Sequence, residues 1–156
     1  MYKLTILAVG KLKEPFWREA RDEFAKRLGP YAKLDIAEVE AERLDGSVSD
    51  EEAMRREGER LLARIPDGAA VIVLDRGGKQ MTSEIFAESV ESVGADGTPI
   101  VFIIGGAAGL HADVLVRADR KLSLSEMTLP HELARVFLLE QIYRATQIIK
   151  GGRYHR

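Results

Sequence analysis

Three segments carry residues whose types and spacing suit chemistry, and the first is a glycine-rich turn. Gly105-Gly106-Ala107-Ala108-Gly109 directly follows Ile100–Ile104, the most apolar run of the chain. Glycines let backbone N–H groups approach a ligand closely and tolerate positive φ angles. In open α/β sheets, ligands lie beyond the carboxyl ends of the strands. The turn is therefore a candidate ligand site, although a plain tight turn between a strand and a helix gives the same pattern.

The second segment, residues 124–131, is apolar but follows neither a helical nor a strand period. Pro130 ends it. A semi-apolar loop of this kind leaves carbonyl and amide groups free, so it can hold a flat purine ring and a thioether. Alternatively, Leu124 and Leu129 fill the core, and the two roles are compatible.

The third segment is Arg153-Tyr154-His155-Arg156, which follows an apolar helical stretch without a spacer. It combines an aromatic ring for base stacking with Arg and His side chains for phosphates or base edges. Terminal residues usually fray, so a disordered basic tail is the alternative.

Several classes of site are disfavoured by what the sequence lacks. Cys is absent, which excludes a disulfide scaffold, a thiol nucleophile and a Cys-ligated zinc site. The loop after the first strand has a single Gly10, so no G-x-G-x-x-G stands there, and neither a Walker A motif nor a G-x-S-x-G elbow occurs. The histidines His111, His131 and His155 form no H-E-x-x-H pair. We expect no metal.

Short β-like runs alternate with helical segments, and these elements must position the three segments. Strands are expected at residues 4–9, 34–39, 69–74, 100–104 and 122–124. Helices are expected from about Pro15 to Leu28, after the capping box of Ser49 and Glu52, after Thr82 or Ser83, at residues 110–116 and at residues 132–150. Residues 75–78 are predicted to form a turn. The alternation is typical of one α/β domain, residues 1–156, with a largely parallel sheet.

The last predicted helix is apolar over most of its circumference, which indicates burial on more than one side. One sheet face can cover only part of it, so a second copy of the chain is the expected cover, with C2 symmetry. A central helix buried within a single chain is the alternative.

Net charge and hydropathy narrow the classes of partner that this protein is expected to bind. With 23 Lys+Arg and 25 Asp+Glu, the net charge is −2 and the pI about 6.0, unlike a strongly basic nucleic-acid binder. The charge is uneven, however: residues 1–34 carry 8 basic and 4 acidic groups, and residues 131–156 carry 5 and 2. Neither a membrane-spanning run nor a signal peptide is recognisable, so a cytoplasmic protein that binds no membrane is expected.

Taken together and in this order, the motifs resemble those of the SPOUT methyltransferases. The resemblance rests on Gly105-Gly106-x-x-Gly109-Leu110, on the 124–130 loop, and on His131, Arg135 and Tyr143-Arg144. The terminal Tyr154-His155-Arg156 narrows it to the RlmH family, and the resemblance covers the whole chain. Two departures stand out: Ala107-Ala108, and Gly151-Gly152-Arg153 before the tail, each replacing residues that the family often has.

The resemblance implies an α/β fold with a mostly parallel sheet of five or six strands flanked by helices and a C-terminal trefoil knot. It implies transfer of a methyl group from S-adenosyl-L-methionine to N3 of a pseudouridine in 23S rRNA within the ribosome. It also implies a homodimer through the last helix. A non-catalytic ribosome-associated RNA-binding factor with this fold is the alternative, and an α/β enzyme that binds another nucleotide at the Gly105 turn is a third.

The resemblance also implies roles for single residues. The implied cofactor-binding residues are Leu74, Gly105, Gly106, Leu124, Ser125, Glu126, Met127, Thr128 and Leu129. N3 of a uracil-type ring must lose a proton before it attacks, which calls for a base or a nearby cation. The implied catalytic residues are His131, Tyr154, His155 and Arg156, and the implied substrate-binding residues are Arg135, Arg144, Tyr154 and Arg156.

Overall fold

A parallel five-stranded sheet forms the centre of the molecule, as seen in a computed structural model that describes residues 1–155. The strand order is β2-β1-β4-β3-β5, and every neighbouring pair is parallel. All carboxyl ends therefore lie at one edge of the sheet, where α/β proteins bind ligands. The strands are β1 (Tyr2–Val9), β2 (Ala32–Val39), β3 (Ala70–Lys79), β4 (Ile100–Ile104) and β5 (Arg120–Leu122).

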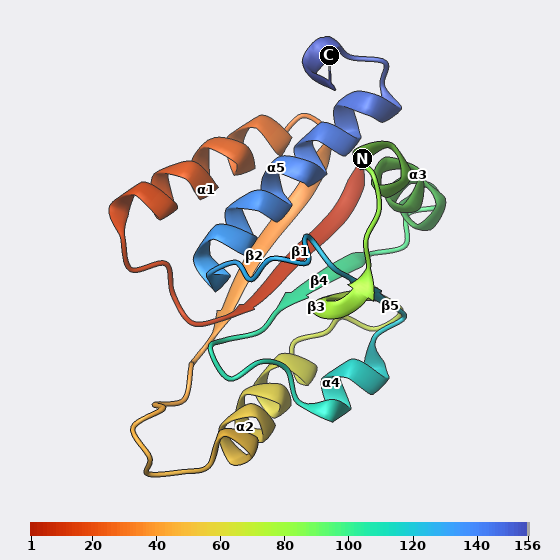
Figure 1. The fold of residues 1–156 in the computed structure, drawn as a ribbon. Helices are drawn as coiled ribbons and strands as arrows, with labels where there is room; N and C mark the ends of the chain where they lie inside the picture. The colour runs from red at the N-terminus through yellow and green to blue at the C-terminus, as the bar shows by residue number, and fades with distance from the viewer. Residues whose placement is uncertain (156) are drawn as a thin grey trace.

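Helices cover both faces of the sheet, as Figure 1 shows. On one face lie α1 (Pro15–Leu28), α3 (Ser83–Gly94) and α5 (His131–Ile149), with α5 between the other two. On the other lie α2 (Asp50–Leu62) and α4 (Ala112–Arg117). Alternate strand residues enter two separate cores, because successive side chains of a strand point to opposite faces. The expected α/β architecture is confirmed, with five strands.

Local sequence sets where the helices begin. Ser49 Oγ accepts a hydrogen bond from the N–H of Glu52 at 3.1 Å, and Thr82 Oγ1 accepts one from the N–H of Ile85 at 3.3 Å. These bonds satisfy N–H groups that a helix start leaves free. The Glu52 side chain does not complete the predicted capping box; it bonds Arg55 and Arg56 instead.

Two boundaries at the β3–β5 edge differ from the sequence expectation. Residues 75–78 were expected to form a turn, yet β3 continues to Lys79, and β5 ends at Leu122 instead of spanning 122–124. The cause is an irregular pairing in which Leu122 is paired with both Leu74 and Lys79. Gly78 permits this approach, since a Cβ there would lie 2.7 Å from the Leu122 backbone. Residues 123 and 124 are thereby released to line a cavity.

Within residues 1–155, none of the helices has both the length and the apolar character that crossing a membrane requires.

Candidate active site

A cavity of about 280 Å³ lies at the carboxyl edge of the sheet, between the ends of β3, β4 and β5 and the start of α5. Its walls are mostly aliphatic side chains and glycine backbone, which suits a flat nucleoside with a thioether-like tail. The lining residues are Leu74, Asp75, Arg76, Ile104, Gly105, Gly106, Gly109, Leu110, Leu122, Ser123, Leu124, Ser125, Met127, Leu129, His131 and Ala134.

The glycine-rich turn forms one wall, and its shape depends on glycine. A Cβ on Gly105 would lie 3.0 Å from Leu110 Cγ, and a Cβ on Gly106 would lie 2.9 Å from Val9 Cγ1. Gly109, at φ +90°, closes the turn by donating its N–H to the Gly106 carbonyl at 3.1 Å. Backbone groups therefore face the cavity at positions where side chains would clash.

The loop before α5 forms another wall. Hydrogen bonds between residues close in sequence hold this loop in shape. Ser123 Oγ donates to the Ser125 carbonyl at 3.1 Å, and the Met127 N–H donates to Ser125 Oγ at 3.0 Å. Of the nine predicted cofactor residues, seven line the cavity. Glu126 and Thr128 are exposed and lie outside the lining.

Two charged residues at the cavity escaped the sequence reasoning. Asp75 and Arg76 follow Leu74 and line the cavity together with it. Reading residues 75–78 as a surface turn hid them. The rule that ligands lie beyond the carboxyl ends of strands was a signal that pointed to them.

His131, the first residue of α5, lines the same cavity. Its Nε2 lies 2.9 Å from Glu132 Oε1, and its side chain is about one-third exposed (32%). Of the four predicted catalytic residues, His131 alone borders the cavity among those that the structure describes.

Arg135, predicted to bind substrate, lies one turn after His131 in the interior, with its side chain 1% exposed. It donates to Glu38 Oε1 at 2.9 Å and to the Gly10 carbonyl at 3.0 Å. Burial lowers the pKa of the Arg135 guanidinium, and Glu38 opposes this shift. As placed, Arg135 joins the start of α5 to the ends of β1 and β2 and offers no surface to RNA.

The other predicted residues that the structure describes, Arg144, Tyr154 and His155, gather along the second half of α5. Arg144 donates to Glu140 Oε1 through Nε at 3.0 Å and Nη2 at 2.5 Å, and the Tyr154 hydroxyl donates to the same oxygen at 3.2 Å. The Arg144 guanidinium lies over the Tyr154 ring, 4.8 Å from its centroid. His155 Nε2 lies 2.7 Å from Glu84 Oε1.

These contacts set the character of the tail. Burial and Glu140 raise the pKa of Tyr154, so its hydroxyl is a hydrogen-bond donor and not a base. The Glu140 carboxylate raises the pKa of Arg144. Residues 153–155 form one turn of 3-10 helix against α5 and are not a free strand of chain. Arg156 lies outside the described residues.

The cavity and the tail therefore lie at different places along one helix. The Tyr154 hydroxyl bonds Glu140, nine residues after His131, so roughly 13 Å of helix axis at 1.5 Å per residue separates this contact from His131 at the cavity. None of the described tail residues, 153–155, lines the cavity of its own chain.

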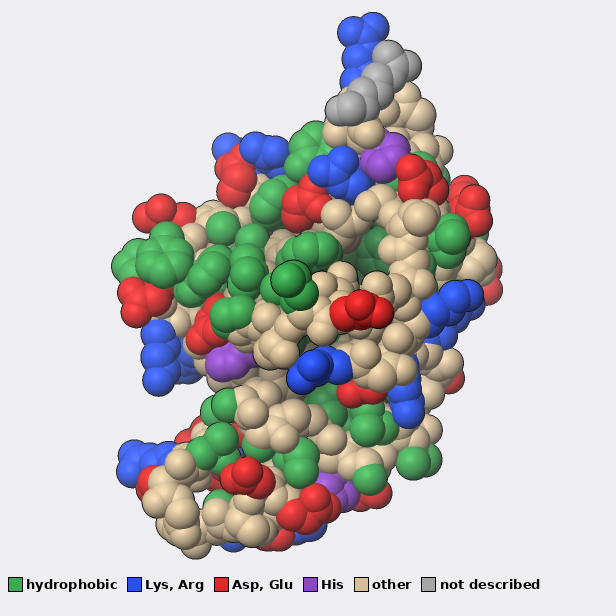
Figure 2. All heavy atoms as spheres, viewed as in Figure 1, with side chains coloured by type: hydrophobic (Ala, Val, Ile, Leu, Met, Phe, Trp, Pro, Cys, Tyr) green, Lys and Arg blue, Asp and Glu red, His purple; other side chains and the backbone are tan. Residues whose placement is uncertain are grey.

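An apolar surface lies beside the cavity. The side chains of Phe16, Met127 and Phe137 are 57%, 78% and 38% exposed. Figure 2 shows hydrophobic side chains gathered over α1 and the first half of α5. Large exposed apolar residues that lie together mark an interaction surface.

Known proteins share both the sequence and the fold. The family described as "Predicted SPOUT methyltransferase" matches residues 2–155, so this chain belongs to the SPOUT methyltransferases. The chain is 49% identical to the ribosomal RNA large subunit methyltransferase H of Clostridium beijerinckii (strain ATCC 51743 / NCIMB 8052). That similarity covers 98% of this chain and 99% of that protein. It is a homologue of that methyltransferase.

Two solved structures share the fold at low sequence identity. A probable methylase family protein from Haemophilus influenzae Rd KW20 superimposes with a TM-score of 0.58 at 12% identity, over 98% of this chain and 70% of that one. The methyltransferase Lpg2936 from Legionella pneumophila, in complex with SAM, gives 0.52 at 14% identity, over 95% of this chain and 66% of that one.

Among residues 1–155, no group of three or more His, Cys, Asp or Glu side chains is arranged to hold a metal ion.

Proposed function

We propose that this chain transfers a methyl group from S-adenosyl-L-methionine to N3 of a pseudouridine in 23S rRNA within the ribosome. The observation that carries the proposal is the cavity: seven residues predicted to bind the cofactor, from three separate parts of the chain, line it together. Its relative of 49% identity is named a large-subunit rRNA methyltransferase. An rRNA substrate of this kind supports a cytoplasmic location.

The cavity fits this cofactor because its walls supply what an adenosyl thioether needs. Gly105, Gly106 and the 124–129 loop would hold the purine ring through backbone groups and apolar contacts. Asp75 and Arg76 supply one negative and one positive charge, which match the amino and carboxylate groups of the methionine part. When bound, the cofactor supplies an electrophilic methyl group on a sulfonium.

Substrate groups divide between the two ends of α5. His131 borders the cavity and is our candidate for accepting the N3 proton. Tyr154 donates a hydrogen bond, and with Arg144 and Arg156 it would orient the base; His155 would contact RNA beside it. Orientation of this kind can lower a barrier by up to roughly 7–11 kcal/mol.

The described tail residues, 153–155, line no part of the cavity of their own chain, which supports a homodimer in which each site uses both chains. Two copies packed antiparallel through α5 would set the tail of one against the cavity of the other. The exposed side chains of Phe16, Met127 and Phe137 would form part of that interface. C2 symmetry then gives two equivalent sites.

A trefoil knot is also part of the proposal. Leu122 is paired with Leu74 and with Lys79, so residues 75–78 bulge around it. The chain then continues from β5 to α5 on the face opposite α4. Such a passage is how a chain threads its own loop.

The direct test incubates the protein with unmodified ribosomes and S-adenosylmethionine and analyses the rRNA nucleosides by mass spectrometry. We expect one N3-methylpseudouridine in 23S rRNA. Methyl on another nucleoside would correct the substrate. Ribosome binding without methyl transfer would support the non-catalytic alternative.

Mixed dimers test the composite site. Gly106→Val distorts the turn that lines the cavity and Tyr154→Phe weakens the tail, so each homodimer is expected to lose activity. In a 1:1 mixture half of the dimers are mixed and each keeps one intact site, which restores about a quarter of wild-type activity. Activity no higher than that of the parent variants would contradict sites shared between chains.

A further inference from the structure

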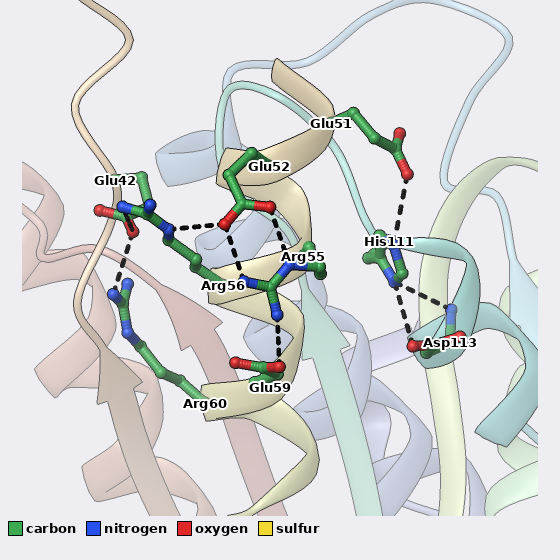
Figure 3. A network of polar contacts seen from close by, with 9 residues as sticks. All are labelled: Glu42, Glu51, Glu52, Arg55, Arg56, Glu59, Arg60, His111 and Asp113. Atoms are coloured by element: carbon green, nitrogen blue, oxygen red, sulfur yellow. Dashed lines mark hydrogen bonds and ion pairs between the residues drawn. The ribbon is translucent and has the colours of Figure 1, made fainter. Parts of the chain in front are cut away.

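A buried carboxylate on α2 belongs to none of the functions assigned so far. Glu57 is 3% exposed, and it faces the core that α2 and α4 form with the sheet. The other charged residues of α2 lie on its outer side. Figure 3 shows Glu52, Arg55, Arg56, Glu59 and Arg60 linked there to one another and to Glu42.

Among the described residues, only one Glu57 oxygen has a hydrogen-bond partner. Oε2 accepts the N–H of Glu42 at 2.9 Å, in the loop of residues 40–49 between β2 and α2. Oε1 is fully buried and accepts no hydrogen bond from any described residue. Burial raises the pKa of Glu57, while the charges of Arg60 and His131 lower it and that of Glu42 adds to the rise. A buried carboxylate oxygen without a donor is rare enough to require an explanation.

The position of Glu57 Oε1 explains why it has no donor. A Cβ on Gly106 would lie 3.5 Å from Glu57 Oε1. Gly106 lines the cavity, so the free oxygen sits behind the turn whose front faces the cofactor site. The turn also has unused donors: the N–H groups of Ala107 and Ala108 bond no carbonyl in the described chain. No side chain of the Gly105-Gly106-Ala107-Ala108 turn can donate a hydrogen bond to Glu57 Oε1, because none is polar.

We propose that Glu57 is a positioning residue for the cofactor cavity. When the cavity is filled, Oε1 accepts a backbone N–H of the Gly105–Ala108 turn, while Oε2 keeps the N–H of Glu42. Cofactor occupancy is thereby transmitted through one carboxylate to the 40–49 loop on the surface. This inference rests on the proposed cofactor, and it adds a residue and a coupled loop that the cavity itself does not include.

The variant Glu57→Gln keeps the size of the side chain nearly constant but removes one of its two acceptor oxygens. A carboxylate offers two oxygens, whereas an amide offers one oxygen and one N–H₂, so the variant can accept only one of the two N–H groups. We expect its affinity for S-adenosylmethionine to fall about tenfold, the scale of one hydrogen bond to a charged group. Glu59→Gln, two residues along and exposed on the outer side, is the matched control and should bind as wild type does.

Hydrogen exchange of backbone amides supplies a readout that a purely structural role would not move. In the wild type, adding S-adenosylmethionine should slow exchange at residues 105–110, 124–129 and 40–49. In Glu57→Gln, the ligand should still protect residues 124–129 but no longer residues 40–49. Glu57→Asp, which keeps the charge but shortens the reach, should behave in the same way.

The outcomes separate this inference from the proposed function. Wild-type protection at 124–129 without protection at 40–49 would overturn the role of Glu57 and leave the cofactor assignment intact. Protection nowhere, with millimolar ligand, would overturn the cofactor assignment itself. The wild-type comparison holds even where a Glu57 variant fails to fold.

Discussion

The two halves of α5 border different kinds of surface. At the His131 end, the cavity is formed mainly by glycine backbone and aliphatic side chains. Along the second half, Glu140, Arg144, Tyr154, His155 and Glu84 form a cluster of charged and aromatic groups. Under the proposed function, the first surface would bind the cofactor by shape and the second would bind RNA by charge, so substitutions should separate the two.

The largest expected effect is at the cavity end. Gly106→Val places a branched side chain where a Cβ already lies 2.9 Å from Val9 Cγ1. Overpacking of this kind costs about 1–3 kcal/mol, which predicts up to ~100-fold weaker binding of S-adenosylmethionine by calorimetry. Ala107→Val, on an exposed neighbour outside the cavity lining, should leave the affinity unchanged. Equal losses in both variants would show that the turn does not act through its fit to the cofactor.

The next effect is at the tail end. Glu140→Gln removes the charge that holds both Arg144 and Tyr154. Because bonds to a charged group are the strong ones, methyl transfer to ribosomes should fall about tenfold. The calorimetric affinity for S-adenosylmethionine should not change. Glu88→Gln, exposed on α3, is the control. A parallel loss of cofactor affinity would mean that the two ends do not act separately.

A smaller effect is expected for the pair between His155 and Glu84. The Glu84 pKa is lowered from 4.5 to about 2 by backbone bonding and by His155. Because folding lowers the pKa of the Glu84 carboxyl, its charge stabilises the folded state fully above pH 4.5. This stabilisation is lost as the pH falls toward 2. Glu84 is exposed, so Glu84→Gln should lower methyl transfer by less than about threefold at neutral pH, and high salt should abolish the difference. A difference that persists in 1 M salt would contradict an exposed ion pair.

The smallest effect on activity should come from α2, far from the tail. Arg55 and Arg56 lower the Glu52 pKa from 4.5 to about 2. The stabilising contribution of Glu52 is therefore complete above pH 4.5 and is lost between pH 4.5 and 2. Urea unfolding should show the free energies of wild type and Glu52→Gln differing by a constant amount above about pH 5 and converging below it. Methyl transfer should be the same in both.

The sequence predicted the backbone-built end better than the charged end. Strand runs and the Gly105 turn follow from apolar patterning and glycine, which depend on few neighbours. Arg135 was predicted to bind substrate and Glu57 was not singled out, because no pattern in a single sequence tells a buried charge with a partner from an exposed one. Asp75 was missed because β3 continues through a stretch rich in turn residues.

The sequence placed His131 and the tail on either side of the predicted helix of residues 132–150, but it did not show that the tail folds back along that helix. Which tail residues bond Glu140 depends on packing, and no spacing rule gives it.

The double pairing of Leu122 has a consequence for how the chain reaches this structure. Residues 74–79 must already be bent before Leu122 can settle among them, and Leu122 lies more than forty residues later in the chain. Contacts between such distant residues slow folding, because a large loop must close before these contacts can stabilise the structure. During synthesis the last third of the molecule would therefore fold only after the first two thirds, and both the tail and the finished cavity would form in the final step.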